Sequence, residues 1–156
     1  YSEEGNVFSR EGFIASMLRF PGQRDEEYRM LKKAQDCLAR VGLSGSADIL
    51  AAALPYGKRR YLEIARALAA EPELVVLDEP SSGLNDAETE ELSILLKSLV
   101  GEGLSIFLIE HDMNLVDRVS DHVVVMQSGK KIAEGPMCEM RQDPKVVEAY
   151  LGSEED

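Results

Sequence analysis

The stretch Leu74-Val-Val-Leu-Asp-Glu79 decides the fold of this chain and also points to a chemistry. Its four apolar residues predict a short buried strand, which places Asp78 and Glu79 as adjacent carboxylates at the C-terminal end of that strand. An aspartate there can hold Mg²⁺ through the water shell of the ion, and the neighbouring glutamate can polarise an attacking water. These roles are typical of nucleotide hydrolysis. An alternative interpretation is a buried strand whose terminal acid only caps the next helix.

A second buried strand is predicted over residues 105–109, and His111 follows its end. A helix over 87–100 lies between the two strands, and this alternation predicts an α/β fold with a parallel sheet and helices on its faces. Ligands of such sheets bind outside the carboxyl ends of the strands, so the two carboxylates and His111 are expected to lie together. His111 is interpreted as a phosphate-sensing group, and a polar residue satisfied by its neighbours is the alternative.

The rest of the chain is helical before Pro72 and mixed after it, which predicts a helical subdomain over 1–72 and a sheet-containing part over 73–156. Capping and turn residues set the expected boundaries. The further predicted elements are helices over 7–20, 25–41 (stopped by Gly42), 44–53 and 59–70, a cap at Asn85-Asp86, a short helix from Asp112 to Val119, a hairpin of 122–126 and 130–133 around Ser128-Gly129, and a final helix from Asp143-Pro144 to Gly152.

Composition excludes several classes of protein. The 156 residues carry a net charge of −12, and the acidic side chains are spread along the predicted helices, which argues against a nucleic-acid binder. Cys37 and Cys138 are far apart and have no metal-ligand spacing, so free thiols in a reducing cytoplasm are expected. No apolar run approaches the ~20 residues that a membrane-spanning helix needs.

A candidate anion site lies upstream of the first strand. Leu54-Pro55-Tyr56-Gly57-Lys58 leads directly into the helix predicted over 59–70. A helix N-terminus after a glycine-containing turn presents free N–H groups and the positive end of the helix dipole. Lys58 would add charge to this site. A plain junction between a loop and a helix is the alternative.

Taken together, these motifs resemble the ATP-binding-cassette (ABC) ATPases in order and spacing. Leu54–Lys58 resembles the signature motif of that family, Leu74–Asp78 the Walker B strand, and Glu79 the catalytic glutamate. Ser82–Asn85 is similar to the D-loop that contacts a second subunit, and His111 matches the switch histidine. The resemblance implies the C-terminal part of a P-loop NTPase nucleotide-binding domain, with a helical subdomain, half of the RecA-like core, and a C-terminal hairpin with helices.

The particular residues in these motifs make the resemblance more specific within the family. The Leu-Pro-Tyr-Gly signature, the asparagine that closes the D-loop, Ile-Glu-His-Asp-Met at 109–113 and Val-Glu-Ala-Tyr-Leu-Gly at 147–152 look like the ATPase of branched-chain amino-acid importers. The resemblance covers nearly the whole chain and is weakest over 1–50.

The sequence departs from the family pattern in three ways. It contains no Gly-x-x-x-x-Gly-Lys-Ser/Thr, so the phosphate loop (Walker A), the adenine-stacking aromatic residue and the glutamine loop are expected before Tyr1. Pro55 replaces the signature serine, which leaves more of the phosphate contact to backbone N–H groups. Asn85 replaces the usual D-loop aspartate and loses a charge near the nucleotide.

The resemblance implies ATP and Mg²⁺ as cofactors, with distinct roles for the matched residues. Asp78 would hold Mg²⁺ through water, Glu79 would orient the attacking water, and His111 would contact the γ-phosphate and the D-loop. Leu54–Lys58 would close onto ATP held by a second, head-to-tail ATPase subunit, identical or not. The residues over 6–53 would dock on transmembrane permease subunits, at the cytoplasmic face of the cell membrane.

The sequence is also compatible with other functions. Without a phosphate loop, the chain as given is expected to be inactive alone, as a fragment that mediates subunit contacts. Its strands, left without neighbours, are expected to favour an assembled oligomer. The transported substrate could also be urea, a short amide or another amino acid. A cassette ATPase of translation or DNA repair is disfavoured by the charge of −12.

Overall fold

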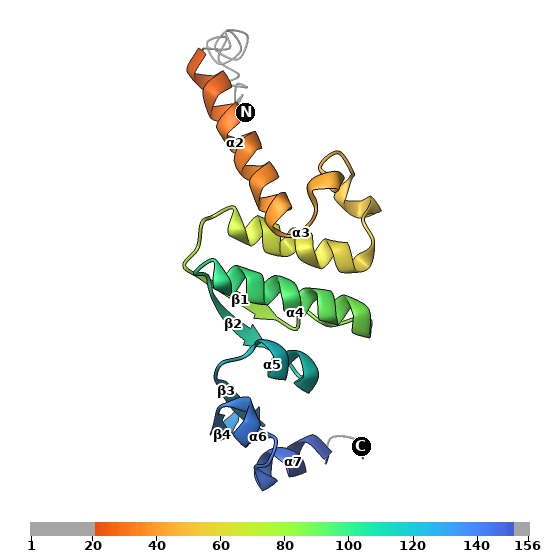
Figure 1. The fold of residues 1–156 in the computed structure, drawn as a ribbon, viewed down its shortest axis with the longest axis vertical. Helices are drawn as coiled ribbons and strands as arrows, with labels where there is room; N and C mark the ends of the chain where they lie inside the picture. Colours follow the sequence, from red (N-terminus) through yellow and green to blue (C-terminus); the bar gives the residue numbers. More distant parts are fainter. Residues whose placement is uncertain (1–20, 152–156) are drawn as a thin grey trace, which may run out of the picture.

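The fold is known from a computed structural model that describes residues 21–151. Its elements follow one another along one long axis, from the N-terminal helix to the C-terminal helices (Figure 1). The helix predicted over 7–20 and the stop at Gly152 lie outside the described residues. No helix within the described range combines the length and apolar character that crossing a bilayer requires.

The first described helix, α2 (Pro21–Arg40), ends where the sequence predicts and begins four residues earlier than expected. Gly42 adopts a left-handed φ of 73°, which few residues other than glycine tolerate. The N–H of Gly42 donates to the carbonyl of Ala39 (3.0 Å), and the N–H of Leu43 donates to the carbonyl of Leu38 (2.8 Å). This paired closure satisfies the last carbonyls of the helix, and it confirms the predicted stop.

The prediction of a helix over 44–53 is wrong. Two separate 3-10 turns, η1 (Ser44–Ser46) and η2 (Ala51–Ala53), occupy this segment. Serine and glycine in η1 favour turns because serine side chains compete for backbone hydrogen bonds and glycine is conformationally free. The next helix, α3 (Tyr56–Leu68), begins three residues before the predicted start, directly after Pro55.

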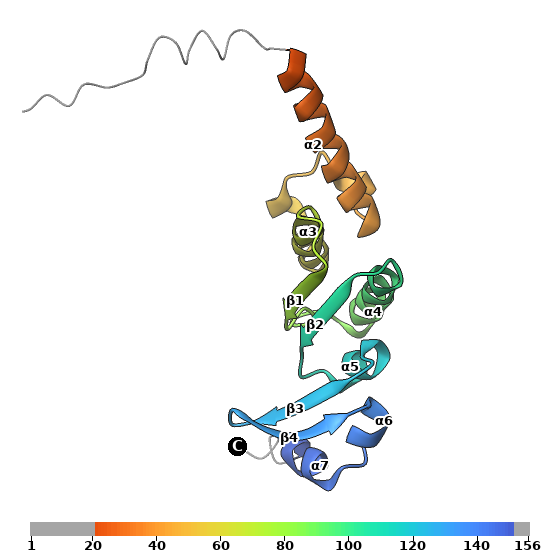
Figure 2. The same ribbon diagram turned by 90° about the vertical axis from the view of Figure 1, so that its left-hand side faces the viewer.

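The predicted parallel pair of strands is confirmed. β1 (Leu74–Asp78) pairs with β2 (Ser105–Ile109) in parallel, with Val76 opposite Phe107 and Asp78 opposite Ile109. The crossover between them is the helix α4 (Asp86–Gly101), which lies against one face of the sheet (Figure 2). Both strands therefore end at the same edge of the sheet.

The helix α4 is fixed at its start and along its length. At its N-cap, the Asn85 side chain accepts from the N–H of Glu88 (3.0 Å) and the Glu88 side chain accepts from the N–H of Asn85 (3.0 Å). This capping box confirms the predicted cap. The apolar stripe of α4 enters a core that also draws on α2, α3, α5 and both strands. Its buried members are Cys37, Val41, Leu43, Ile64, Ala65, Leu68, Val75, Leu92, Leu96, Leu99, Leu104 and Leu115.

This core contains residues from both sides of residue 72. Because the helical part and the sheet share buried side chains, the described region packs as one unit across the expected boundary. The division into 1–72 and 73–156 therefore stays a prediction about the organisation of the protein.

The expectation that both strands are buried is wrong for one face of the sheet. Residues alternate along each strand, and those that point away from α4 are exposed. The exposed fractions are 55% for Leu74, 60% for Val76, 58% for Phe107 and 47% for Ile109. Among residues 21–151, no helix covers this face, which we call the open face of the sheet.

The C-terminal region forms a second, smaller core. The helix α5 (Met113–Val119) leads into the antiparallel hairpin of β3 (Val123–Gln127) and β4 (Lys130–Gly135). Ser128 and Gly129 both have positive φ, as a two-residue hairpin turn requires, and this confirms the predicted hairpin.

Two short helices follow the hairpin, α6 (Met137–Met140) and α7 (Pro144–Leu151). Met137, Met140 and Val146 form the buried centre of the second core. The predicted cap of α7 is confirmed, because an Asp143 carboxylate oxygen accepts from the N–H of Lys145 at 2.8 Å. Both cysteines lie in the described region as free thiols, as predicted.

Self-association through the open face gives the first testable prediction. We expect the chain to form oligomers, because exposed apolar strands favour association with another chain. The substitution Val76→Lys should shift the chain toward monomer. Ile94→Lys is the matched control, because Ile94 on α4 is also 60% exposed but lies off the sheet. Light scattering after size-exclusion chromatography measures both. A stable wild-type monomer, or equal effects of the two substitutions, would contradict the prediction.

Candidate functional site

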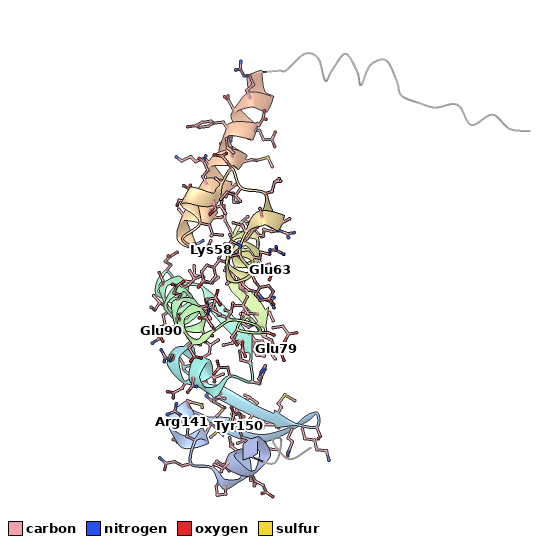
Figure 3. All side chains as sticks on the ribbon, turned by 90° about the vertical axis from the view of Figure 1, so that its right-hand side faces the viewer. Lys58, Glu63, Glu79, Glu90, Arg141 and Tyr150 are labelled. Carbon is pink, nitrogen blue, oxygen red and sulfur yellow. The ribbon has the colours of Figure 1, made fainter. Side chains whose placement is uncertain are left out.

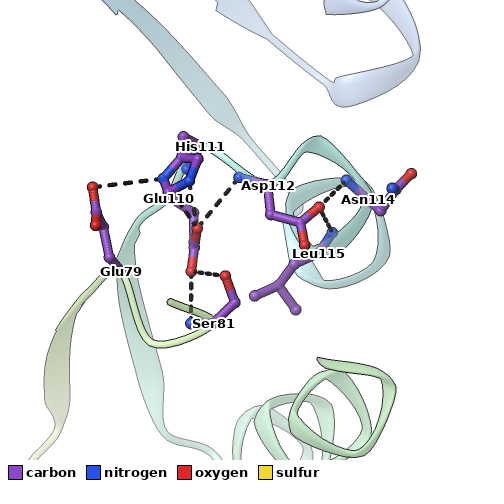
Figure 4. A network of polar contacts seen from close by, with 7 residues as sticks. All are labelled: Glu79, Ser81, Glu110, His111, Asp112, Asn114 and Leu115. Carbon is purple, nitrogen blue, oxygen red and sulfur yellow. Dashed lines mark hydrogen bonds and ion pairs between the residues drawn. The ribbon is translucent and has the colours of Figure 1, made fainter. Parts of the chain in front are cut away.

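The structure brings Glu79 and His111 together at the carboxyl edge of the sheet, as the sequence predicts. Asp78 is the last residue of β1, and Glu79 follows it with its N–H donating to the carbonyl of Ile109 on β2 (2.9 Å). The Glu79 carboxylate lies 3.5 Å from Nδ1 of His111 (Figure 4). The acid and the imidazole therefore face each other across the ends of two adjacent strands.

These side chains are open to solvent. The Glu79 side chain is 54% exposed and that of His111 is 74% exposed, so their mutual attraction is weak. Asp78 is also exposed, and within the described region its side chain makes no hydrogen bond or ion pair. Groups this accessible can bind a ligand without first breaking internal contacts.

The backbone that presents Glu79 is strained. Glu79 has a left-handed φ of 43°, which costs a residue with a side chain about 1–2 kcal/mol. Two backbone hydrogen bonds hold it there: its N–H donates to Ile109, and its carbonyl accepts from the N–H of Ser82 (3.1 Å). Residues held in such conformations cluster at functional sites, because the surrounding structure must over-determine them.

A buried carboxylate joins the two strand ends from beneath. The side chain of Glu110 has an exposed fraction of 0%. Its Oε1 accepts from the N–H (2.8 Å) and the hydroxyl (2.6 Å) of Ser81, and its Oε2 accepts from the N–H groups of His111 (3.0 Å) and Asp112 (3.3 Å). Ser81 follows β1 and the other two residues follow β2. Glu110 thus connects the segment that carries Glu79 to the segment that carries His111 (Figure 4).

The protonation of Glu110 follows from this environment. Burial alone would raise the pKa of its carboxyl group. The hydrogen bonds from the Ser81 hydroxyl and from the N–H groups of Ser81, Asp112 and His111 outweigh burial, and they hold the pKa of Glu110 below its usual value of 4.5. Glu110 is therefore an ionised acceptor at neutral pH.

The second group of candidate residues lies at the start of α3. Pro55 is the N-cap residue, and no side chain caps the helix, so the first N–H groups of α3 have no capping partner. Arg59 closes the preceding turn by donating to the carbonyls of Leu54 (3.0 Å) and Ala52 (2.7 Å). Gly57 lies within the first turn of α3, whereas the sequence placed it in a turn before the helix.

This helix start packs against the D-loop-like segment Ser82–Asn85. The Tyr56 hydroxyl donates to the carbonyl of Ser82 (3.3 Å). A Cβ atom at Gly83 would lie 2.9 Å from the Tyr56 ring, and a Cβ atom at Gly57 would lie 2.8 Å from the Glu88 carboxylate. A Cβ atom at Gly83 would therefore have to displace the Tyr56 ring, and one at Gly57 would have to displace the Glu88 side chain at the start of α4.

The structure does not bring the two groups of candidate residues into one site. Lys58 on α3 lies above Glu79 along the long axis in Figure 3, and it makes no hydrogen bond or ion pair with Asp78, Glu79 or His111. Lys58 is exposed and makes no ion pair with another described residue.

The donor set at the sheet edge fits Mg²⁺ only as part of a larger site. Among residues 21–151, no three histidine, cysteine or acidic side chains are grouped for a metal ion. Mg²⁺ commonly uses one or two carboxylates and fills its octahedron with waters and substrate phosphates. The exposed carboxylate of Asp78 suits such a site.

Three residues carry a role that the sequence did not reveal. Glu110 and Ser81 are 29 positions apart, so no local spacing predicts that they bond. The sequence feature that could have indicated the role of Glu110 is its position as an acid at the end of an apolar strand, beside His111. Arg59, which shapes the turn before α3, gave no signal beyond its position next to Lys58.

Two families match the sequence. Residues 4–82 match the family described as "ABC transporter", and residues 130–156 match "Branched-chain amino acid ATP-binding cassette transporter".

Similar proteins are longer than this chain. The chain is 40% identical over 141 residues to the "High-affinity branched-chain amino acid transport ATP-binding protein BraF" of Pseudomonas aeruginosa, which covers 90% of the chain and 55% of BraF. It is 40% identical over 144 residues to LivG of Escherichia coli, a protein of the same description, which covers 92% of the chain and 56% of LivG. The chain thus spans little more than half the length of these relatives.

A solved structure of an ATP-binding cassette also matches most of this chain and about half of its own length. The ADP conformation of MJ1267, described as an ATP-binding cassette of an ABC transporter, superposes with a TM-score of 0.74 at 34% identity. The match covers 80% of this chain and 50% of MJ1267.

The contact between Tyr56 and Gly83 generates a prediction about stability. Gly83→Ala places a Cβ atom in a left-handed residue (φ 78°) and against the Tyr56 ring. The left-handed conformation alone costs about 1–2 kcal/mol, and displacement of the ring adds to this. Gly103→Ala is the matched control, because Gly103 also has positive φ (98°) but open space around it.

Urea unfolding of both variants separates the two costs. We expect Gly83→Ala to lower the free energy of unfolding more than Gly103→Ala does. Equal losses would mean that the Tyr56 contact does not restrict position 83.

Proposed function

The chain belongs to the ABC transporter family, and on that basis we propose that it carries the hydrolytic edge of the ATPase subunit of an importer. The observation that carries the proposal is the pairing of Glu79 with His111 at the carboxyl ends of adjacent parallel strands, directly after Asp78. This edge is where nucleotide phosphates bind in open α/β sheets. The fold is the α/β fold of ABC ATP-binding cassettes.

In the proposed reaction, the exposed side chains at the sheet edge act on ATP and water. Asp78 would hold Mg²⁺, and Glu79 accepts a hydrogen bond from the attacking water and orients it. His111 binds the γ-phosphate while its Nδ1 edge stays near Glu79. When bound, Mg²⁺ neutralises charge that develops on the phosphates.

The start of α3 is proposed to act on a second ATP. Its uncapped N–H groups and the exposed ammonium of Lys58 suit an anion, but they are not joined to the carboxylates of the same chain. We propose that Leu54–Lys58, with Ser82 and Asn85 packed beside it, closes onto the nucleotide of a head-to-tail partner subunit. Closure on ATP and reopening after hydrolysis would drive a permease.

The proposed partners are a second ATPase subunit and transmembrane permease subunits. The residues over 6–53 are proposed to meet the permease, so the subunit would lie at the inner face of the cell membrane. Branched-chain amino acids are the proposed cargo, because BraF and LivG are described as transporting them and residues 130–156 match the corresponding family. Urea, short amides and other amino acids are the competing cargoes.

A second candidate function is a non-hydrolysing fragment that mediates subunit contacts. The observation that favours it is the sequence, whose 156 residues contain no phosphate-binding loop. Cradling phosphates requires a run of correctly oriented backbone N–H groups, which isolated lysines do not replace.

The hydrolytic role of Glu79 predicts the effect of one substitution. We define the full-length cassette as this chain joined to the part of E. coli LivG that its match leaves uncovered. Glu79→Gln in this cassette should retain ATP binding and lower kcat by about 10²-fold or more, because the amide is a poor base for the attacking water. Steady-state phosphate release and equilibrium nucleotide binding measure the two effects.

Glu91→Gln is the matched control, since Glu91 is an exposed glutamate on α4 away from the sheet edge. Wild-type turnover in the Glu79→Gln variant would overturn the role of Glu79. A wild-type cassette that binds ATP and releases no phosphate would overturn the hydrolytic function itself.

The second candidate predicts a different result for the 156-residue chain on its own. Without a phosphate loop, it should not bind labelled ATP–Mg²⁺ at micromolar concentrations in equilibrium dialysis. The full-length cassette provides the positive control. Tight binding by the isolated chain would refute the fragment interpretation.

A further inference from the structure

Glu110 occupies an unusual place at the sheet edge, because its side chain is fully buried next to two exposed site residues. Its side chain is 0% exposed, while the neighbouring side chains of Glu79 and His111 are 54% and 74% exposed. A buried acid is expensive unless its charge is satisfied. Four hydrogen bonds from three residues satisfy it here, at 2.6–3.3 Å.

Every group that contacts Glu110 through these bonds is a donor. Both carboxylate oxygens accept twice, one from Ser81 and the other from His111 and Asp112. A carboxylate offers two acceptor atoms, whereas an amide offers one acceptor and would turn its NH₂ group toward donors. The arrangement therefore requires a carboxylate of this length and not only a polar residue.

The two ends of this network are the segments that present the reacting side chains. On one side, Glu79 is held at a φ of 43°, and the N–H of Ser81, two residues later, donates to Glu110. On the other side, the N–H of His111 donates to the same carboxylate. The 3.5 Å approach of Glu79 to His111 lies next to this shared anchor (Figure 4).

We propose that Glu110 is a positioning residue for the ATP hydrolysis proposed above, and that its buried carboxylate sets the placement of Glu79 relative to His111. This role rests on the proposed function, and Glu110 itself touches neither nucleotide nor water in it. Glu110 holds Ser81, and through it the strained turn at Glu79, against the start of the segment that carries His111. Loss of the anchor lets the acid and the imidazole separate.

The role predicts a split between kcat and KM in the full-length cassette. Glu110→Gln should lower kcat for ATP hydrolysis by about tenfold or more, because small displacements of catalytic groups are costly. It should leave the KM for ATP within about twofold, because no nucleotide contact is removed. Glu91→Gln, the same chemical change on exposed α4, should leave both constants unchanged.

A milder substitution, with its own control, tests the same role in case Glu110→Gln prevents folding. Ser81→Ala removes only the 2.6 Å hydroxyl bond and keeps the backbone N–H bond to Glu110, so it should lower kcat by about threefold. Ser93→Ala is its control, since Ser93 is also a buried serine, with its hydroxyl bonded inside α4. Glu110→Gln and Ser81→Ala combined should cost less than the product of the single losses, because they break the same bond.

Amide hydrogen exchange in the 156-residue chain tests the anchor without any catalysis. In Glu110→Gln, the N–H groups of Ser81, His111 and Asp112 should exchange about tenfold faster or more, while the amide of Leu96 in the core of α4 keeps its rate. Unchanged exchange at all three amides would overturn the anchor. Faster exchange together with a normal kcat in the cassette would overturn the positioning role.

These outcomes separate this inference from the proposed function. If the wild-type cassette hydrolyses ATP and Glu110→Gln does so equally well, the positioning role fails and the proposed function stands. If the wild-type cassette binds ATP without hydrolysing it, the proposed function fails, and the positioning role fails with it.

Discussion

The candidate site depends on one buried charge. Two parallel strands end at the same edge of the sheet, but their following segments diverge, one toward α4 and the other toward α5. Glu110 holds these segments together because its carboxylate accepts four hydrogen bonds from both of them. The cost of burying the charge makes these bonds hard to give up. The strained residue Glu79 and the exposed ring of His111 are both presented from this anchor.

The sheet itself is covered on one side only. The helix α4 and the large core bury one face, while Val76 and Phe107 lie side by side on the open face. The relatives BraF and LivG are nearly twice as long as the matched region, and half of the solved cassette MJ1267 lies outside the superposition. The chain therefore matches only part of these longer proteins.

The start of α3 and the segment Ser82–Asn85 form a second unit, held by close packing. Tyr56 lies against Gly83, and Gly57 lies against Glu88, with no room for a Cβ atom at either glycine unless a neighbouring side chain moves. No hydrogen bond or ion pair among the described residues joins Lys58 of this unit to Asp78, Glu79 or His111.

Much of the local structure was predictable because it depends on short-range chemistry. Gly42 ends α2, Asn85 caps α4, and Ser128-Gly129 turns the hairpin, each through bonds within a few residues. The alternation of strand and helix likewise determined the parallel pairing that places Asp78, Glu79 and His111 at one edge. The prediction of a helix over 44–53 was wrong because serine and glycine favour turns there. Only the tertiary structure decided which strand face is covered, that Tyr56 packs on Gly83, and that Glu110 bonds Ser81. These contacts join segments far apart in the chain, so their energy comes from packing and burial, which no local pattern of residues encodes.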